Sequence, residues 1–192
     1  MVVLNTAILP QLRMSVEDYL QADLPEGQCY ELVNGVVEMS PTPDMDHADS
    51  VDALLEAILE YGKAHPGVFV RATVTRCSVA IPGKVTVREP DLAVYKDWGR
   101  RGQGWSAWLK ITPILVAEAV SPGQAVRDYP DKRKDYWRAG IREYWIIDRD
   151  ARKVTVFTRG EKRWQPQEYA PEQEARSEVL PGFSIAVSRL LA

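Results

Sequence analysis

The chain has 192 residues, of which 45% are hydrophobic and 27% charged, as expected for one globular domain of ordinary size. Its 24 basic and 27 acidic residues give a net charge of −3. This excludes a uniformly basic protein, so a nucleic-acid partner would have to meet a local basic patch. No apolar run reaches the ~20 residues that a membrane-spanning helix needs, and we expect no membrane contact.

The first elements expected along the chain are an arm, a short helix and a hairpin. Residues 1–14 are mildly apolar and have no basic leader, so we expect an N-terminal arm that packs on the body or on a second subunit. Ser15 is a suitable N-cap for a helix over residues 16–21. Asn34-Gly35 between two apolar runs predicts a hairpin over residues 30–39.

Helix and strand patterns then alternate toward the C-terminus. Apolar residues at helical spacing predict a long helix, namely Ala48, Val51, Leu54, Leu55, Ile58, Leu59 and Gly62. Strands are expected at residues 68–74, 77–81, 91–95, 114–120, 144–147, 154–157 and 164–169. A second helix is expected at residues 129–139, with Asp128 as its N-cap. This order predicts one α/β domain over residues 1–192, with a mixed β-sheet flanked by helices.

Two acids on expected core strands indicate chemistry. Glu118 is the single acid in the apolar run 114–120, where a carboxylate is costly to bury unless a cation or a metal pairs with it. Asp91 opens another expected strand directly after Pro90. On neighbouring strands, the two carboxylates could together hold a hard divalent cation such as Mg²⁺ or Mn²⁺. The alternative is that both acids lie at strand ends and pair with arginine or lysine.

Lys132 favours the first of these interpretations. Asp128, Lys132 and Tyr136 follow one another at intervals of four residues and therefore share one helix face. An ammonium group placed by that face over the carboxylates would stabilise the charge that develops during phosphodiester hydrolysis. The alternative is a solvated helix face, because residues 131–135 form a charged run.

Seven motifs together resemble a known family. In order they are YELVNG (30–35), MSP (39–41), EPD (89–91), LVAEAVSP (115–122), Asp128 with Lys132, AGIREYWIID (139–148) and LPGFS (180–184). From about residue 15 to 191, the chain is similar to the Uma-two family of restriction endonucleases, a branch of the PD-(D/E)XK nuclease superfamily. The resemblance implies a restriction-endonuclease-like fold and a nuclease activity.

The resemblance also implies roles for particular residues. Asp91 and Glu118 match the two acids of the superfamily site, and Glu31 matches a further acid. Val120 stands where the superfamily usually has its lysine, whereas Lys132 matches a lysine that this family places on the next helix. The family often has histidine at the position of His47, where it could contact a phosphate or a water molecule. A helix residue without a catalytic part is the alternative for His47.

The loop over residues 96–110 interleaves Trp98, Trp105 and Trp108 with basic and glycine residues. Such a composition suits stacking on nucleic-acid bases, although loop anchors or a subunit interface are the alternative. Together with the apolar arm, the loop suggests a homodimer.

The hypothesis from sequence is a Mg²⁺-dependent or Mn²⁺-dependent endonuclease that hydrolyses phosphodiester bonds in DNA. The backbone carbonyl of Ala119 would be a further metal ligand, and Tyr136 would contact a phosphate. Cys29 and Cys77 fit no metal-binding spacing, so we expect reduced thiols in a cytoplasmic protein. The alternatives are a catalytically silent nucleic-acid-binding or scaffold protein that retains the fold, and a phosphoesterase acting on small nucleotides.

Overall fold

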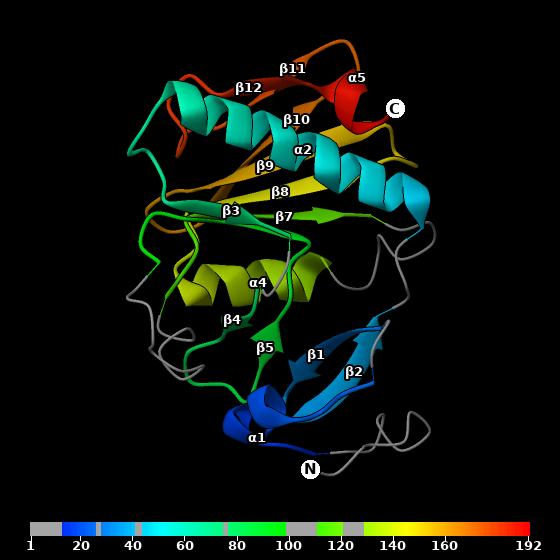
Figure 1. The fold of residues 1–192 in the computed structure, drawn as a ribbon, viewed down its shortest axis with the longest axis vertical. Helices are drawn as coiled ribbons and strands as arrows, with labels where there is room; N and C mark the ends of the chain where they lie inside the picture. Colours follow the sequence, from blue (N-terminus) through cyan, green and yellow to red (C-terminus); the bar gives the residue numbers. More distant parts are fainter. Residues whose placement is uncertain (1–12, 26–27, 41–43, 75–76, 99–110, 121–128) are drawn as a thin grey trace.

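A six-stranded mixed sheet forms the centre of the molecule (Figure 1). The computed structural model describes residues 13–25, 28–40, 44–74, 77–98, 111–120 and 129–192. The sheet has the order β10-β9-β8-β7-β6-β3. Its strands are β3 (Arg71–Thr73), β6 (Leu92–Tyr95), β7 (Leu115–Ala119), β8 (Glu143–Asp148), β9 (Lys153–Arg159) and β10 (Trp164–Tyr169). Among the strands that the structure describes, only β7 and β8 pair in parallel, and α4 (Tyr129–Ala139) lies between them in the chain.

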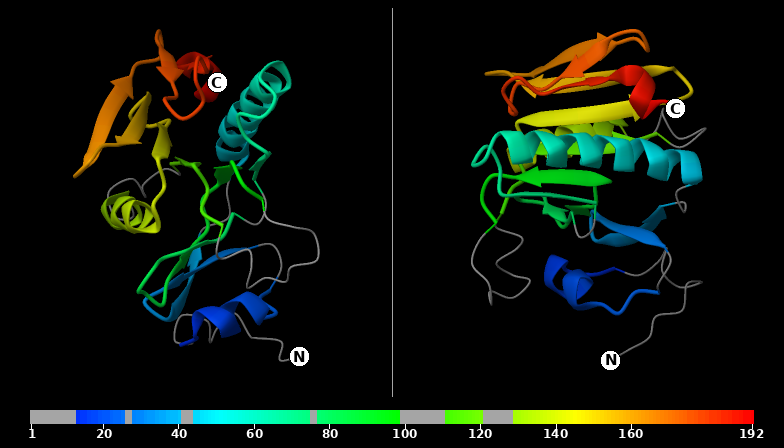
Figure 2. Two further views of the ribbon diagram at one scale, coloured as in Figure 1. Left: turned by 90° about the vertical axis from the view of Figure 1, so that its left-hand side faces the viewer. Right: turned by 45° about the horizontal axis from the view of Figure 1, so that its top comes forward.

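The two long helices cover opposite faces of this sheet (Figure 2). On one face, α2 (Met45–Ala64) packs through residues such as Leu54 against Ala117 of β7. On the other face, Tyr136 of α4 packs against Val116 of β7. Because successive side chains of a strand point to opposite faces, β7 is buried on both sides, as its continuous apolar run predicts.

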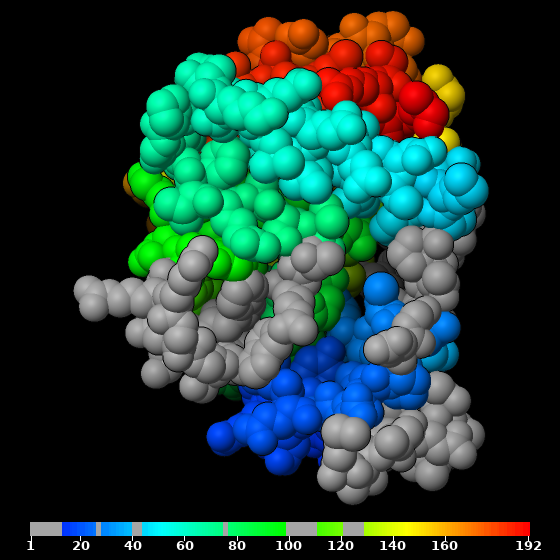
Figure 3. Space-filling view, in the orientation of Figure 1, coloured from blue at the N-terminus to red at the C-terminus, as the bar shows by residue number. Residues whose placement is uncertain are grey.

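A second, four-stranded sheet lies beyond α4 and has the order β2-β1-β5-β4 (Figure 1). Its strands are β1 (Cys29–Val33), β2 (Val36–Ser40), β4 (Val79–Ala80) and β5 (Val87–Arg88). The turn between β1 and β2 has Asn34 at φ 51° and Gly35 at φ 82°, the left-handed backbone that a tight two-residue hairpin turn requires. Figure 3 shows α1 (Val16–Gln21) and this hairpin as the blue lower part of the molecule.

The C-terminal segment completes the hydrophobic core on the side of the sheet that α2 covers. It forms β11 (Glu174–Arg176), β12 (Ser184–Ala186) and α5 (Val187–Leu190). Glu143 on β8 is fully buried and accepts hydrogen bonds from the Trp145 indole (2.7 Å) and the Glu178 backbone N–H (2.7 Å). The Glu143 carboxylate therefore fastens this segment to the central sheet.

The predicted mixed α/β architecture is confirmed, including the hairpin at Asn34-Gly35 and both long helices. The sequence did not reveal β5 or the C-terminal elements, because these strands have only two or three residues and show no periodicity of their own. Trp98 lies against Tyr95, with the Arg71 guanidinium 4.5 Å from its ring centre, as a loop anchor would. Residues 1–12, Trp105, Trp108 and Asp128 lie outside the described residues. No helix in the described part of the chain is long and apolar enough to cross a membrane.

Candidate active site

Strand pairing brings Asp91 and Glu118 to neighbouring positions. β6 and β7 are antiparallel and pair Leu92 with Ala117. Asp91 immediately precedes β6, so continuing this register places it opposite Glu118. The Glu118 carboxylate contacts α4, whereas the Asp91 carboxylate contacts His47 of α2. The Asp91 side chain is 23% exposed and the Glu118 side chain 7%, so Asp91 is the more accessible acid.

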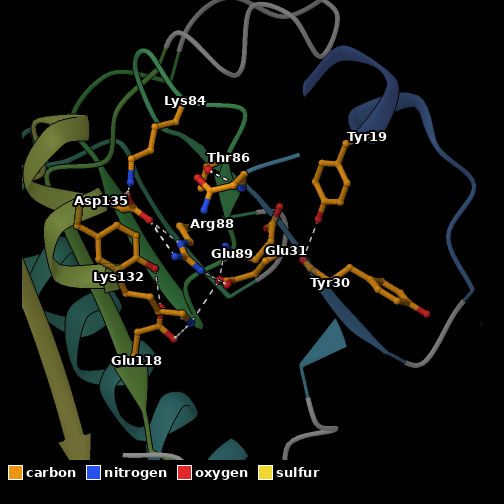
Figure 4. A network of polar contacts seen from close by, with 12 residues as sticks. Tyr19, Tyr30, Glu31, Lys84, Thr86, Arg88, Glu89, Glu118, Lys132 and Asp135 are labelled. Atoms are coloured by element: carbon orange, nitrogen blue, oxygen red, sulfur yellow. Dashed lines mark hydrogen bonds and ion pairs between the residues drawn. The ribbon is translucent and has the colours of Figure 1, made fainter. Parts of the chain in front are cut away.

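Lys132 joins the acids of the two sheets (Figure 4). Its ammonium group on α4 donates to both carboxylate oxygens of Glu118 at 2.9 Å and lies 3.3 Å from Oε1 of Glu31 on β1. All three side chains are nearly buried. The Tyr136 hydroxyl, one helical turn after Lys132, donates to Oε1 of Glu118 at 2.5 Å. Two residues of α4 thus hold one carboxylate of β7.

Asp91 has different partners. Its Oδ2 accepts the backbone N–H of Ala119 at 2.8 Å and lies 3.2 Å from Nε2 of His47. His47 belongs to the first turn of α2, where Asp44 caps the helix through the His47 backbone N–H. Burial lowers the pKa of the His47 imidazole, but the hydrogen bond and the charge of Asp91 outweigh burial and raise it.

Glu89 is a further acid at this site that was not identified from the sequence. It stands two residues before Asp91, its backbone N–H donates to Oε1 of Glu31 at 3.1 Å, and its carboxylate accepts from the Ser78 hydroxyl. The EPD motif offered a clue, because acids at positions i and i+2 of an extended segment point to the same side. We refer to Glu31, Glu89, Asp91, Glu118 and Lys132 together as the acidic centre.

Two carboxyl groups of the acidic centre have raised pKa values, because they are buried and lie close to other acids. Burial raises the pKa of Glu118 to about 7; Lys132 opposes this change, whereas Asp91 and Glu31 add to it. Burial also raises the pKa of Glu89 to about 8, against the Ser78 hydrogen bond and reinforced by repulsion from Glu31. Burial opposes the charge of Lys132 as well, but the attraction of Glu118 and Glu31 outweighs it and raises the pKa of the ammonium group.

The carboxylates of the acidic centre, together with the neighbouring Ala119 carbonyl, fit a hard divalent cation in the chemistry of their donor atoms. Its ligands would be carboxylate oxygens and the Ala119 carbonyl, which Mg²⁺ and Mn²⁺ prefer, and the surplus negative charge favours such an ion. Among the described residues, no three His, Cys, Asp or Glu side chains are already gathered as a metal-binding group. Lys132 instead supplies the positive charge between Glu118 and Glu31.

The residues predicted from sequence thus fall into two groups. Glu31, Glu118 and Lys132 are in direct contact, and Asp91 lies beside them with Ala119 and His47. Tyr136 is fully buried, and its hydroxyl is bound to Glu118. In this position its hydroxyl contacts Glu118, and the contact with a phosphate stays a prediction.

Comparisons with known proteins agree with this fold. The family model Uma2, described as "Putative restriction endonuclease", matches residues 16–188. A crystal structure of a putative nuclease belonging to DUF820 from Anabaena variabilis ATCC 29413 has a TM-score of 0.72 and 17% sequence identity, covering 93% of this chain and 97% of that chain. At this identity, the likeness shows the fold alone. No curated protein sequence matches the chain.

Proposed function

The chain belongs to the Uma2 family of putative restriction endonucleases, and we propose that it is a Mg²⁺-dependent or Mn²⁺-dependent endonuclease that cleaves DNA. The observation that supports this most is the pairing of β6 with β7, which puts Asp91 opposite Glu118 with the Lys132 ammonium bound to Glu118. A pair of acids on adjacent strands with a nearby cation suits phosphodiester hydrolysis.

Asp91, Glu118 and the Ala119 carbonyl would hold the divalent ion, with Glu31 completing the set directly or through water. When bound, the ion would polarise a phosphoryl oxygen and lower the pKa of a water molecule. Asp91 is oriented for this task by the Ala119 backbone N–H, and Glu118 by the Tyr136 hydroxyl. These hydrogen bonds hold the two carboxylates in place before a substrate arrives.

Lys132 would act as a charged group. Its raised pKa keeps it an ammonium ion at neutral pH, so it would orient the attacking water and donate to the developing charge on the phosphate. The same direction of the pKa disfavours Lys132 as the group that accepts the proton. His47 lies 3.2 Å from Asp91 and would contact a phosphate or a water molecule at the more exposed side of the acidic centre.

The proposal includes a reducing, cytoplasmic setting, supported by the two free cysteines, Cys29 and Cys77. The second candidate is a nucleic-acid-binding or scaffold protein that retains the fold without catalysis. One observation favours it: Lys132 already pairs with Glu118 and Glu31, so the fold needs no metal to satisfy these carboxylates.

A cleavage assay separates the two candidates. Purified protein is incubated with plasmid and with oligonucleotides, with Mg²⁺, with Mn²⁺ or with a chelator. Asp91→Asn and Glu118→Gln should abolish metal-dependent cleavage, while Asp52→Asn, an exposed acid of α2, should cleave as the wild type does. Cleavage that survives in both site variants would contradict the proposal, and binding of DNA without any cleavage would favour the scaffold.

A further inference from the structure

A row of alternating charges leads away from the acidic centre (Figure 4). It begins with Lys132 and Glu31 and continues through Arg88, Asp135 and Lys84. Arg88 Nη1 donates to Oε2 of Glu31 at 2.8 Å, and its Nε and Nη2 both lie 2.9 Å from Oδ2 of Asp135. The Lys84 ammonium closes the row at 2.5 Å from Oδ1 of Asp135.

The centre of this row is buried, although burial of an ion pair is a poor source of stability. Arg88 is 7% exposed and Asp135 2% exposed. Removing two charges from water costs free energy that their attraction often does not recover, so a well-packed apolar pair is frequently as stable. The proposed hydrolysis assigns no step to either residue. The pair therefore calls for a role other than stability.

The geometry indicates what the pair does. Arg88 ends β5, the strand that pairs with β1, and Glu31 lies on β1. Asp135 lies on α4, one helical turn after Lys132. The guanidinium group is planar and rigid, and it grips Glu31 with one edge and Asp135 with another. Arg88 thus connects the strand that carries Glu31 to the helix that carries Lys132.

The charges lead to the same conclusion. Arg88 alone would cancel the negative charge of Glu31, which is one of the acids available to a divalent ion. Asp135 offsets the charge of Arg88, so that the acidic centre keeps its excess of carboxylates. An uncharged side chain at position 88 could still hold Glu31 near β5, but it would not form the ion pair with Asp135 on α4.

We propose that Arg88 and Asp135 are positioning residues of the acidic centre: their ion pair holds Glu31 and Lys132 at the spacing that hydrolysis needs. This inference rests on the proposed nuclease function. Neither residue touches the reacting atoms, and both act through Glu31 and α4. Displacing a catalytic group by about 1 Å can lower a rate about 10²-fold, so loss of the Arg88–Asp135 ion pair should lower the cleavage rate measurably.

The test is the double variant Arg88→Met/Asp135→Leu. It removes both charges of the pair together. Glu31 keeps its contacts with Lys132 and the Glu89 backbone N–H, and the Lys84 ammonium is 35% exposed to water, so the melting temperature should fall less than in Arg88→Met alone. We expect kcat for Mg²⁺-dependent cleavage to fall at least about tenfold while KM changes less than about threefold, because positioning is lost and not substrate binding. Calorimetric titration with Mn²⁺ should show weaker binding in the double variant.

A matched control uses an ion pair far from the acidic centre. Lys153 on β9 and Glu168 on β10 lie 2.5 Å apart on the surface, and Lys153→Met/Glu168→Leu makes the same chemical change there. We expect wild-type kcat, KM and Mn²⁺ affinity in this control. Should Arg88→Met/Asp135→Leu fail to fold, Asp135→Asn carries the test: it keeps the side-chain volume, removes the charge and replaces one of the two oxygens that accept from Lys84 and Arg88 with an NH2 donor.

The outcomes separate this inference from the proposed function. Wild-type kcat and Mn²⁺ affinity in a folded double variant, or in Asp135→Asn, would overturn the inference and leave the nuclease proposal intact. A wild type that does not cleave would overturn both. A fall in kcat and in Mn²⁺ affinity that the control does not share would support the positioning role.

Discussion

Replacing Glu118 with glutamine should stabilise the metal-free protein at alkaline pH while abolishing its proposed activity. The carboxylate is buried and bonded to Lys132 and Tyr136, yet burial raises its pKa to about 7. In the unfolded chain the same group ionises near its ordinary pKa of 4.5. Ionised Glu118 is therefore disfavoured by the fold, and glutamine keeps nearly the same shape without the charge.

The size of the effect follows from the pKa of Glu118. The difference between a pKa of about 7 and 4.5 corresponds to roughly 3 kcal/mol, at 1.36 kcal/mol for each pKa unit. Because the folded-state pKa is raised, this stability is fully present below pH 4.5 and is lost as pH rises through 7. For a chain of 192 residues, 3 kcal/mol corresponds to a melting temperature difference of roughly 6–12 °C.

Scanning calorimetry in chelator-containing buffers at pH 5, 6, 7 and 8.5 measures the difference directly. The two proteins should differ least at pH 5, and the variant should melt progressively higher than the wild type up to pH 8.5. Glu60→Gln, an exposed acid of α2, controls for the general loss of one charge and should show no such divergence. A Glu118→Gln protein that melts lower than the wild type at pH 8.5, or by a constant difference at every pH, would refute the reasoning.

Four further predictions follow from the same site. A divalent ion at a hundredfold excess over its Kd should stabilise the wild type by about 2.7 kcal/mol, and Glu118→Gln should largely lose this response in a thermal-shift series with Ca²⁺ as the non-catalytic control. Lys132→Ala should lower the cleavage rate by about 10²-fold or more in single-turnover assays, because its charge would stabilise the phosphate in the transition state, and an unchanged rate would contradict this role. The pKa of His47 is raised by Asp91, so that pair stabilises the fold below the His47 pKa and loses this contribution as pH rises through it. His47→Gln should consequently lower the melting temperature more at pH 5.5 than at pH 8.5. If the chain is a homodimer, sedimentation should give a species of twice 21.7 kDa at micromolar concentration, and a single 21.7 kDa species would contradict this.

The sequence alone determined those features that depend on neighbours along the chain. The hairpin at Asn34-Gly35 follows from the left-handed backbone of these two residues, and the helices follow from apolar spacing and capping. The importance of Glu118 also follows locally, because an acid in a strand buried on both faces must find a partner. Strand pairing then required only that β6 and β7 be neighbours for Asp91 and Glu118 to come opposite one another.

The tertiary structure decided everything that depends on how the two sheets pack around α4. Arg88 contacts Asp135 across 47 positions of the chain and Glu31 across 57, and no periodicity of the sequence connects residues so far apart. The buried environment of Glu89 is equally a product of packing, since Ser78, just before β4, and Glu31 on β1 reach it from elsewhere in the fold. Even the direction of Lys132 was open, because the charged run 131–135 is compatible with a solvated face. Lys132 is buried because β1 and β7 bring Glu31 and Glu118 to α4 from two sides, where their combined attraction exceeds the cost of removing the ammonium group from water.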